Sequence, residues 1–464
     1  MTGKYQAYPE YKNSGIQWLD ETPVHWSTSK LRYMFSFGKG LTITKENLLD
    51  EGVPCVNYGE VHSKYGFEVD PAIHPLKYVS EDYLKSSSSA LLSKGDLVFA
   101  DTSEDIDGSG NFTQLTSDQA VFAGYHTIIA RPIDGKNSRF YAYLFDSKEF
   151  RTQIRTAVKG VKVFSITQAI LCGVNVWLPT IEERNHIANF LDHETAKIDT
   201  LIEKQQQLIK LLKEKRQAVI SHAVTKGLNP NAPMRDSEVE WLGEVPEGWS
   251  SPKIKWFFHT ESGGTPNTSK QEEYYQDGEI PWIRTTDLNN NDLFETPVAI
   301  TDQAVKDSAC SLLPENAVLI AMYGGAGSIG KHSLLKFKST INQAVCAILP
   351  NEKIDSDFLH MYVEFYRPYW MVGAEGTRKD PNINQDVIRE LVVPCPPVEE
   401  QTKIVFVTKN KLSAIDEIIQ KSKLNIALMQ ERRTALISAA VTGKIDVRNW
   451  QAPQQKQNKR EAAA

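Results

Sequence analysis

Two long segments of the chain repeat apolar and polar positions with the period of an α-helix. In the first segment, residues 181–227, apolar side chains recur at steps close to three and four and no Pro or Gly occurs before Gly227. The apolar positions are Ile187, Leu191, Ile198, Leu201, Leu208, Leu212 and Val219. This spacing predicts one long helix with a narrow apolar seam that lies along another helix. At 1.5 Å per residue, some 40 residues of this segment make a helix roughly 60 Å long.

The second segment repeats the first at a constant offset, without insertions. Pro179, Glu182, Glu183 and Asp199 recur as Pro396, Glu399, Glu400 and Asp416, and AVISHAVTKG at 218–227 recurs as ALISAAVTGK at 435–444. A constant offset over this length indicates an internal duplication. The second seam (Leu412, Ile415, Ile419, Ile426, Met429) is interrupted by Ser422 and Asn425. We expect the two helices to pack as an antiparallel pair.

The duplication continues outside the helices. WLDETPVHW at 18–26 matches WLGEVPEGW at 241–249, LSKGDLVFA at 92–100 resembles LPENAVLIA at 313–321, QAV at 119–121 matches QAV at 343–345, and ITQ at 166–168 matches INQ at 383–385. The chain is therefore predicted to alternate globules and helices. The expected parts are an N-terminal arm (1–26), a first globule (27–179), a central helix (180–227), a linker (228–249), a second globule (250–396), a C-terminal helix (397–447) and a disordered tail (448–464).

Short apolar runs predict a mixed α+β fold for both globules. Strands are expected at 96–100, 120–130, 317–321 and 343–349, and helices at 140–159 and 357–372. The landmarks repeat while the residues between them differ. Two modules with a common scaffold and different surfaces suit the recognition of two different ligands.

Composition is that of a globular protein of two or three domains, with 464 residues, of which 41% are apolar and 24% charged. The first residues lack the apolar core of a signal peptide and no apolar run is long enough to cross a membrane, so a cytoplasmic location is expected. The five cysteines form no CxxC pair and are expected to be reduced. A net charge of −6 argues against general coating of nucleic acid but allows a local basic surface.

Cationic residues recur at steps of three and four in the first globule: Lys148, Arg151, Arg155, Lys159 and Lys162. On a helix they would form one stripe able to follow a DNA backbone. On the stripe alone, an ordinary solvated helix face is the favoured interpretation. In the second globule the corresponding region contains Arg378 and Lys379.

Polar and aromatic residues near predicted turns have donors and acceptors that suit the reading of base edges. They are Asn57 and Tyr58 in the first globule and Arg284, Thr285 and Tyr323 in the second. Any polar loop offers similar groups, so this pattern alone does not identify a site.

The stretch GAGSIGK at 325–331 nearly satisfies the phosphate-binding pattern GxxxxGK[ST], with Lys331 as the phosphate-binding lysine. His332 stands where the Ser or Thr is required, and the equivalent stretch of the first globule, DTSEDIDG at 101–108, is acidic. A glycine-rich hairpin is the simpler interpretation, and a nucleotide-binding enzyme remains an alternative. No other catalytic motif or metal-ligand spacing is present, so an enzyme is not expected.

Taken in order, these motifs resemble the specificity (S) subunits of type I restriction-modification systems over essentially the whole chain. The resemblance is carried by the WLxExPxxW segments at 18 and 241, the joints at Pro179 and Pro396, the paired helices, and GGTP at 263–266, which includes Thr265. In the first globule FGKGL at 37–41 replaces GGTP, so its loop cannot be placed by matching.

The resemblance implies two target recognition domains joined by an antiparallel coiled coil, each binding half of a bipartite, asymmetric site in double-stranded DNA. It also implies two modification subunits that methylate adenine N6 with S-adenosylmethionine, and restriction subunits that use ATP and Mg. These cofactors would belong to the partners, and this chain would bind none. A coiled-coil scaffold that binds no DNA is the other alternative.

Overall fold

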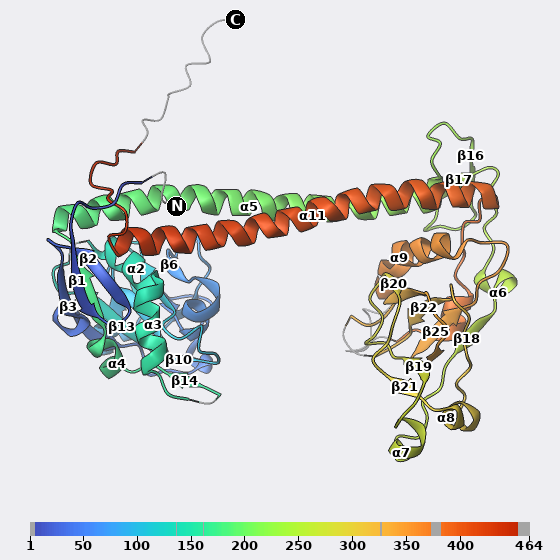
Figure 1. Ribbon diagram of the computed structural model, residues 1–464, viewed down its shortest axis with the longest axis horizontal. Coiled ribbons are helices and arrows are strands. Elements are labelled where there is room, and N and C mark those ends of the chain that lie inside the picture. Colours follow the sequence, from blue (N-terminus) through green and yellow to red (C-terminus); the bar gives the residue numbers. More distant parts are fainter. Residues whose placement is uncertain (1–4, 136, 161, 325–326, 373–381, 453–464) are drawn as a thin grey trace, which may run out of the picture. The chain divides into compact units, whose positions relative to one another are not determined.

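The computed structural model describes residues 5–135, 137–160, 162–324, 327–372 and 382–452. The chain divides into two compact units, Met1–Gln205 with Leu424–Ala464, and Gln206–Lys423. Each unit contains one globule and one half of each long helix, α5 (Ile181–Lys226) and α11 (Val398–Val441), which are drawn in green and red in Figure 1. Both predicted helices are confirmed, although the second ends at Val441 and not at residue 447.

Local chemistry fixes the ends of these helices. The Thr180 hydroxyl accepts a hydrogen bond from the Glu183 amide (3.3 Å), which satisfies a free donor of the first turn of α5. Gly227 follows α5 with φ +74° and Gly443 follows α11 with φ +76°, and glycine adopts this left-handed conformation without strain. A Cβ atom at Gly227 would meet the Trp249 ring at 3.1 Å, and one at Gly443 would meet the Trp26 ring at 3.2 Å.

The two helices run antiparallel, and equivalent ion pairs join them in the two units. In the first unit Arg433 binds Asp199 (3.0 Å) and Asp146 (3.5 Å). In the second unit Arg216 binds Asp416 (3.4 Å) and also Glu364. The interval from Arg216 to Arg433 is the same as the interval from Asp199 to Asp416. The duplication therefore includes the contacts that hold each globule to the helix pair.

The predicted seam is correct at its ends and wrong in the middle of α5. Ile187, Leu191 and Ile198 are buried in the first unit, but Leu201 and Leu208 are 50% and 38% exposed. Ile202, one position after Leu201, packs on the core of the first unit instead. In α11 the predicted interruption at Ser422 lies on the seam, where the serine is buried. Buried positions continue at steps of three and four through polar residues here. Assigning the seam by apolar residue type alone therefore gave wrong positions.

The first globule is built on a five-stranded sheet and a four-stranded sheet. The five-stranded sheet has the order β4 (Phe35–Lys39), β13 (Thr127–Pro132), β9 (Leu97–Ala100), β11 (Phe112–Leu115) and β6 (Phe67–Val69). The four-stranded sheet has the order β7 (Lys77–Val79), β5 (Val53–Val56), β12 (Val121–Ala123) and β8 (Leu91–Leu92). Three short pairs complete it: β1 (Tyr11–Ile16) with β2 (Leu19–Pro23), β3 (Ser27–Lys30) with β15 (Asn175–Leu178), and β10 (Thr102–Ser103) with β14 (Phe164–Ser165).

The second globule repeats the topology of the five-stranded sheet strand by strand. Its sheet has the order β18 (Thr260–Ser262), β25 (Val345–Ile348), β22 (Val318–Ala321), β23 (His332–Leu335) and β20 (Asp292–Leu293). Neighbouring strands are antiparallel except for the last pair, which is parallel in both globules. The other strands are β21 (Ala299–Ile300), β19 (Ile280–Ile283) and β24 (Thr340–Ile341) in one sheet, and the pair β16 (Met234–Asp236) and β17 (Glu244–Pro246). The α+β fold, used twice, is confirmed.

Short helices cover the sheets. They are α1 (Tyr83–Ser86), α2 (Ser138–Asp146), α3 (Lys148–Ala157) and α4 (Gln168–Gly173) in the first globule, and α6 (Ile254–Phe257), α7 (Gln271–Tyr274), α8 (Asp302–Asp307), α9 (Ser356–Val372) and α10 (Gln385–Arg389) in the second. The helix predicted at 140–159 is in fact two helices, because Ser147 leaves the helical conformation and caps α3 by accepting a hydrogen bond from the Phe150 amide.

Two further expectations are wrong, and a third is wrong in its described part. The strand expected at 120–130 is two strands, separated by Gly124, Tyr125 and His126. The two QAV sequences are not equivalent, because Val121 lies in β12 whereas Val345 lies in β25, the counterpart of β13. The described part of the predicted tail is ordered, since Trp450 packs edge-on against Phe190; residues 453–464 lie outside the described residues.

Candidate nucleic-acid interface

In the first globule, loops from both sheets meet beyond the ends of β5, β9 and β12. The Tyr58 amide donates to the carbonyl of Tyr125 (3.3 Å) and the Asp101 amide donates to that of His126 (3.1 Å). The His62 ring contacts the Ser103 hydroxyl through Nε2 (3.1 Å). These bonds gather the loops at one end of the globule into a single polar surface.

Of the two residues predicted to read bases in this globule, one is accessible. Asn57 is only 1% exposed and its side-chain amide donates to the carbonyl of Cys55 (3.4 Å), so it shapes the loop from inside. Tyr58 is half-buried and its ring stacks on His62, with centroids 5.0 Å apart. Burial raises the pKa of the Tyr58 hydroxyl, and the carboxylates of Glu104 and Asp105 raise it further. The phenol is therefore a protonated donor at neutral pH.

The predicted cationic stripe is broken. Lys148 begins α3, but α3 ends at Ala157, so Lys159 and Lys162 lie beyond the helix, where Lys159 forms an isolated β-bridge with Ser165. Arg151 is bound by Asn111 (2.9 Å) and Asp146 (3.1 Å), which makes it a structural residue.

Arg155 reaches the acidic loop between β9 and β11. It donates to the carbonyl of Asp107 (2.6 Å), and its guanidinium lies 3.4 Å from the Asp107 carboxylate. Lys148, Lys159 and Lys162 are exposed. Of the five predicted phosphate contacts, Lys159 and Lys162 are the exposed cations near these loops, and Arg155 is available only after its contact with Asp107 is broken.

The equivalent loops of the second globule bring most of its predicted residues together. Thr265 and Gln343 are hydrogen-bonded through their side chains, and the Tyr323 hydroxyl donates to the carbonyl of Gln343 (3.1 Å). Arg284 is held by Asp287 (3.1 Å) and remains partly exposed. Thr285 is buried beside Gly324. Arg378 and Lys379 lie outside the described residues.

The glycine-rich stretch does not form a phosphate-binding loop. Its described part, residues 327–331, connects the antiparallel strands β22 and β23, and His332, in the position that should start a helix, is buried in β23. A phosphate-binding loop needs the free amides of a following helix. Lys331 is half-buried at the end of the hairpin. The nucleotide-binding alternative is not favoured.

The structure also identifies a loop that matching of motifs missed. The Gly264 amide donates to the carbonyl of Ile341 (3.1 Å), and the Leu41 amide donates equivalently to that of Ala123 (2.8 Å). Residues 40–43 are therefore the counterpart of GGTP, and Thr42 corresponds to Thr265. The same interval separates the two WLxExPxxW segments, at 18 and 241, so this equivalence was available in the sequence.

Comparison with known proteins decides the family. A model described as "Type I restriction modification DNA specificity domain" matches residues 23–211 and 246–428. This chain belongs to the type I restriction-modification specificity family. The two matched regions are the two repeats, each consisting of a globule and most of the long helix that follows it.

Curated relatives are similar over most of their length. A putative type I restriction enzyme MjaX specificity subunit of Methanocaldococcus jannaschii is 24% identical over 93% of this chain and 96% of its own. The EcoBI specificity subunit of Escherichia coli is 24% identical over 75% and 74%. The HsdS subunit from Thermoanaerobacter tengcongensis has the same fold, with a TM-score of 0.52, 15% identity, and coverage of 91% of this chain and 98% of that one. Another solved structure, from a study of type I R-M complex assembly, gives a TM-score of 0.70 at 15% identity and covers 91% of this chain and 99% of its own.

The family sets the role of the chain. The chain is a DNA specificity subunit with two target recognition domains, and specificity subunits are non-catalytic components of type I complexes. Within the described residues, no group of three His, Cys, Asp or Glu side chains could hold a metal ion, and no helix is long and apolar enough to span a membrane.

Proposed function

We propose that this chain reads a bipartite, asymmetric site in double-stranded DNA, with one half-site bound by the loops of each globule. The main support is that the two globules share their topology and helix contacts but not their loop side chains. Val56 and Ile283 occupy equivalent strand ends, yet the accessible side chain that follows is Tyr58 in one globule and Arg284 in the other, whereas Asn57 and Thr285 are buried. Different donors and acceptors at equivalent places select different base pairs.

The two half-sites are held by different electrostatics. The first globule presents Asp101, Glu104 and Asp105 near Tyr58, and carboxylates repel phosphates but accept hydrogen bonds from cytosine N4. In the second globule the described loops carry Arg284 and Lys331. We therefore expect the two globules to differ in the salt dependence of their DNA contacts.

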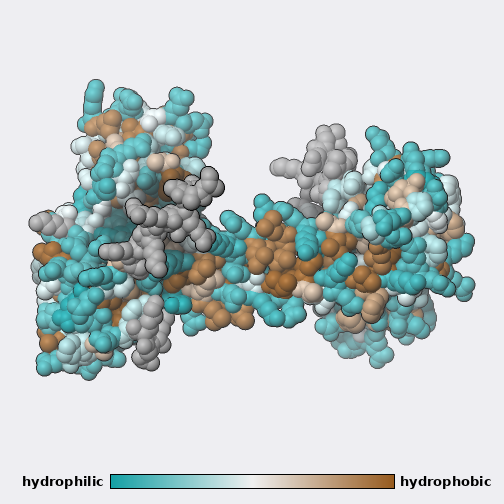
Figure 2. All heavy atoms as spheres, turned by 90° about the horizontal axis from the view of Figure 1, so that it is seen from above, coloured by the Kyte–Doolittle hydropathy of each residue, from teal (hydrophilic) through white to brown (hydrophobic). Residues whose placement is uncertain are grey.

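The proposal includes two copies of a modification subunit, a methyltransferase for adenine N6. Each unit carries an equivalent pair of exposed apolar residues on the helices: Leu201 and Leu428 (50% and 53%) in the first, Ile418 and Leu211 (44% and 61%) in the second. Figure 2 shows apolar side chains on the outer surface of the helices. Equivalent apolar positions in two units suit two copies of one partner. S-adenosylmethionine would be bound by these partners, and ATP and Mg by restriction subunits.

The decisive experiment maps methylated adenines in a host that expresses this chain with its modification subunit. We expect one bipartite motif with unlike halves. Exchange of the loop residues 57–62 for those of another specificity subunit should change one half of the motif and leave the other intact. Methylation without a common motif, or no shift of DNA by the assembled complex, would favour the scaffold alternative.

A further inference from the structure

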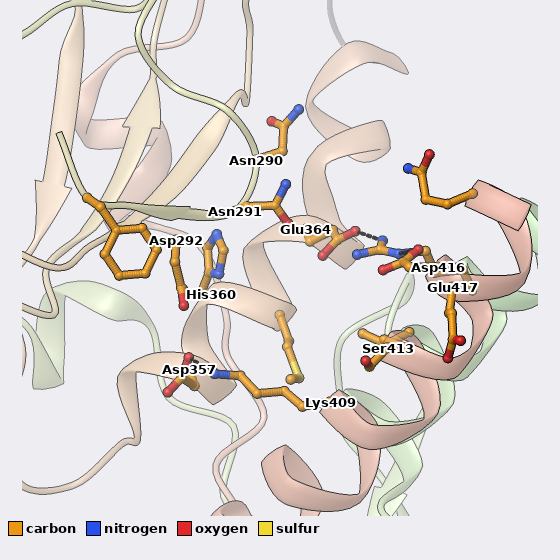
Figure 3. Close-up of a pocket in the computed structure, with 15 residues that line it drawn as sticks. Asn290, Asn291, Asp292, Asp357, His360, Glu364, Lys409, Ser413, Asp416 and Glu417 are labelled. Atoms are coloured by element: carbon orange, nitrogen blue, oxygen red, sulfur yellow. Dashed lines mark hydrogen bonds and ion pairs between the residues drawn. The ribbon is translucent and has the colours of Figure 1, made fainter. Parts of the chain in front are cut away.

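In the second unit, a groove of about 620 Å³ opens between α9, α11 and the loop around β20. Figure 3 shows the side chains that line it, with Asp357, His360 and Glu364 on one helix facing Lys409, Ser413 and Asp416 on the other. Phe294, at the edge of the groove, is 71% exposed. The target-recognition loops do not account for this groove.

The internal repeat identifies what occupies the same place in the first unit. Arg433 and Arg216 each bind a carboxylate of the globule helix, Asp146 and Glu364 respectively, so α2 and α9 align there. Arg139 and Asp357 each lie seven positions before these carboxylates, and Tyr143 and Met361 each lie three positions before them, so these residues are counterparts. The constant offset between the two long helices, the one that relates Asp199 to Asp416, pairs Asp192 with Lys409.

The strand edges align as well. Val69 pairs with Leu115 in a parallel ladder, and Leu293 pairs with Leu335 in the same way. The Leu115 amide donates to the carbonyl of Asp96, immediately before β9, and the Leu335 amide donates to that of Ala317, immediately before β22. These equivalent bonds fix the alignment of β6 with β20. Phe67 is therefore the counterpart of Asn291.

In the first unit this place is filled by a ring in contact with two cations. The Phe67 ring lies under the guanidinium groups of Arg139 (4.7 Å) and Arg433 (5.5 Å) and packs on the Tyr143 ring at 4.8 Å. Arg139 in turn binds Asp192 (2.7 Å) and Glu68 (2.8 Å). The first unit supplies from its own chain both an aromatic ring and a guanidinium.

The second unit keeps the surroundings and lacks both groups. Asn291 replaces the ring, and Asp357, which replaces the arginine, binds Lys409 (2.5 Å). Arg216, the counterpart of Arg433, still lines the groove. The groove thus retains one cation for a ring to stack on and has a carboxylate in place of the other cation.

We propose that this groove receives a segment of one modification subunit that presents an aromatic ring next to an arginine or lysine. The ring stacks on Arg216, and the cation binds Asp357 and Asp292 in competition with Lys409 and with Lys336, which lies 3.9 to 4.0 Å from both carboxylates. DNA does not fit, because five carboxylates line the groove (Asp292, Asp357, Glu364, Asp416, Glu417) against two cations. The inference rests on the proposed function for the identity of the partner. Because the first unit fills its own groove, only one of two modification subunits is held this way.

The test introduces into the groove of the second unit the side chains that occupy the same place in the first unit. In the triple variant, Asn291→Phe, Asp357→Arg and Lys409→Asp reproduce Phe67, Arg139 and Asp192. A milder variant, Phe294→Ala, removes an exposed ring at the edge of the groove and carries little risk for folding. Leu312→Ala, also exposed (56%) in the second unit but not lining the groove, is the matched control.

The full chain is titrated with purified modification subunit, by calorimetry and native mass spectrometry. For the wild type and the control we expect two copies bound with unequal affinity. In the triple variant the tighter step weakens at least tenfold and the other is unchanged, and Phe294→Ala weakens the same step several-fold. If both variants keep both affinities, or Phe294→Ala tightens binding, the groove inference is overturned. If the wild type binds no modification subunit, the proposed function itself fails.

Discussion

Single residues show how the repeat has diverged in its interior. His332 and His360 occupy the places of Phe112 and Ala142, and both are buried, at 1% and 8% exposure. Their rings share a hydrogen bond of 2.8 Å between Nδ1 of His332 and Nε2 of His360. Burial lowers the pKa of His360 to about 4 and lowers the pKa of His332 as well.

This pair predicts an acid-sensitive second unit. The folded state holds His360 neutral, whereas in the unfolded chain the histidine takes up a proton below its ordinary pKa of about 6.5. Stability is therefore complete above a pH of about 6.5 and falls as the pH is lowered toward 4. At pH 5, His360 alone accounts for a loss of about 2 kcal/mol.

Calorimetric unfolding between pH 7.5 and 5 measures this loss. The double variant His332→Phe, His360→Ala introduces the residues found at the equivalent places of the first unit. It should reduce the pH dependence of the unfolding of the second unit. An equally steep dependence in the double variant would show that other groups carry it.

Lys159 tests the phosphate role at the scale of one side chain. It is exposed beside the loops of the first globule that are proposed to bind DNA, and it has no ion pair among the described residues. Lys159→Ala should weaken binding of the assembled complex similarly for all DNA sequences and lower the salt slope by about one. Lys94→Ala is the control, because Lys94 precedes β9 and lies at the strand end opposite to the loop that starts at Asp101. A loss confined to the cognate sequence would instead assign Lys159 to base recognition.

At the scale of elements, two adjacent positions of α5 are expected to have different effects: one on the stability of the first unit and the other on binding of the modification subunit. Ile202 packs on the core of the first unit, whereas Leu201 is half exposed. Ile202→Gln should destabilise the first unit by roughly 2 kcal/mol, because a polar side chain replaces a packed one. Leu201→Gln should change stability by no more than about 0.5 kcal/mol and weaken binding of the modification subunit. Urea unfolding and a titration with that subunit distinguish the two effects; similar unfolding curves for the two variants would contradict the observed seam.

The same elements show what the sequence could predict. Long-range identity at a constant offset located both helices to within a few residues, because insertions are absent from the paired helices. The three-residue match QAV failed, since matches of this length arise by chance, whereas the match of ITQ with INQ held, because Thr167 and Asn384 cap α4 and α10. Asn57 is buried against Gly124 and Arg151 is bound by Asn111, and no local pattern reveals these contacts because the partners lie far apart in the sequence. Thr42 was accessible to the offset argument and was missed only because its flanking residues differ from GGTP.

At the scale of the whole molecule, the two units share two continuous helices. α5 passes from the first unit into the second after Gln205, and α11 returns after Lys423. If these helices set the separation of the half-sites, then an insertion at the boundary should alter the gap in the recognised sequence without altering what each globule reads.

Four residues inserted after Gln205, with four more after Lys423 to preserve the antiparallel register, add about 6 Å to each helix. This length corresponds to roughly two base pairs of B-DNA at about 3.4 Å per base pair, and one helical turn of added residues nearly preserves the orientation of the apolar seam. Methylated-adenine sequencing in a host that carries the variant should recover both half-sites with a longer gap between them. A motif with altered half-sites and the original gap would show that the spacing is set elsewhere. Insertion of two residues in each helix is a useful contrast, because it turns the seam by about half a turn and should abolish the complex instead of extending the gap.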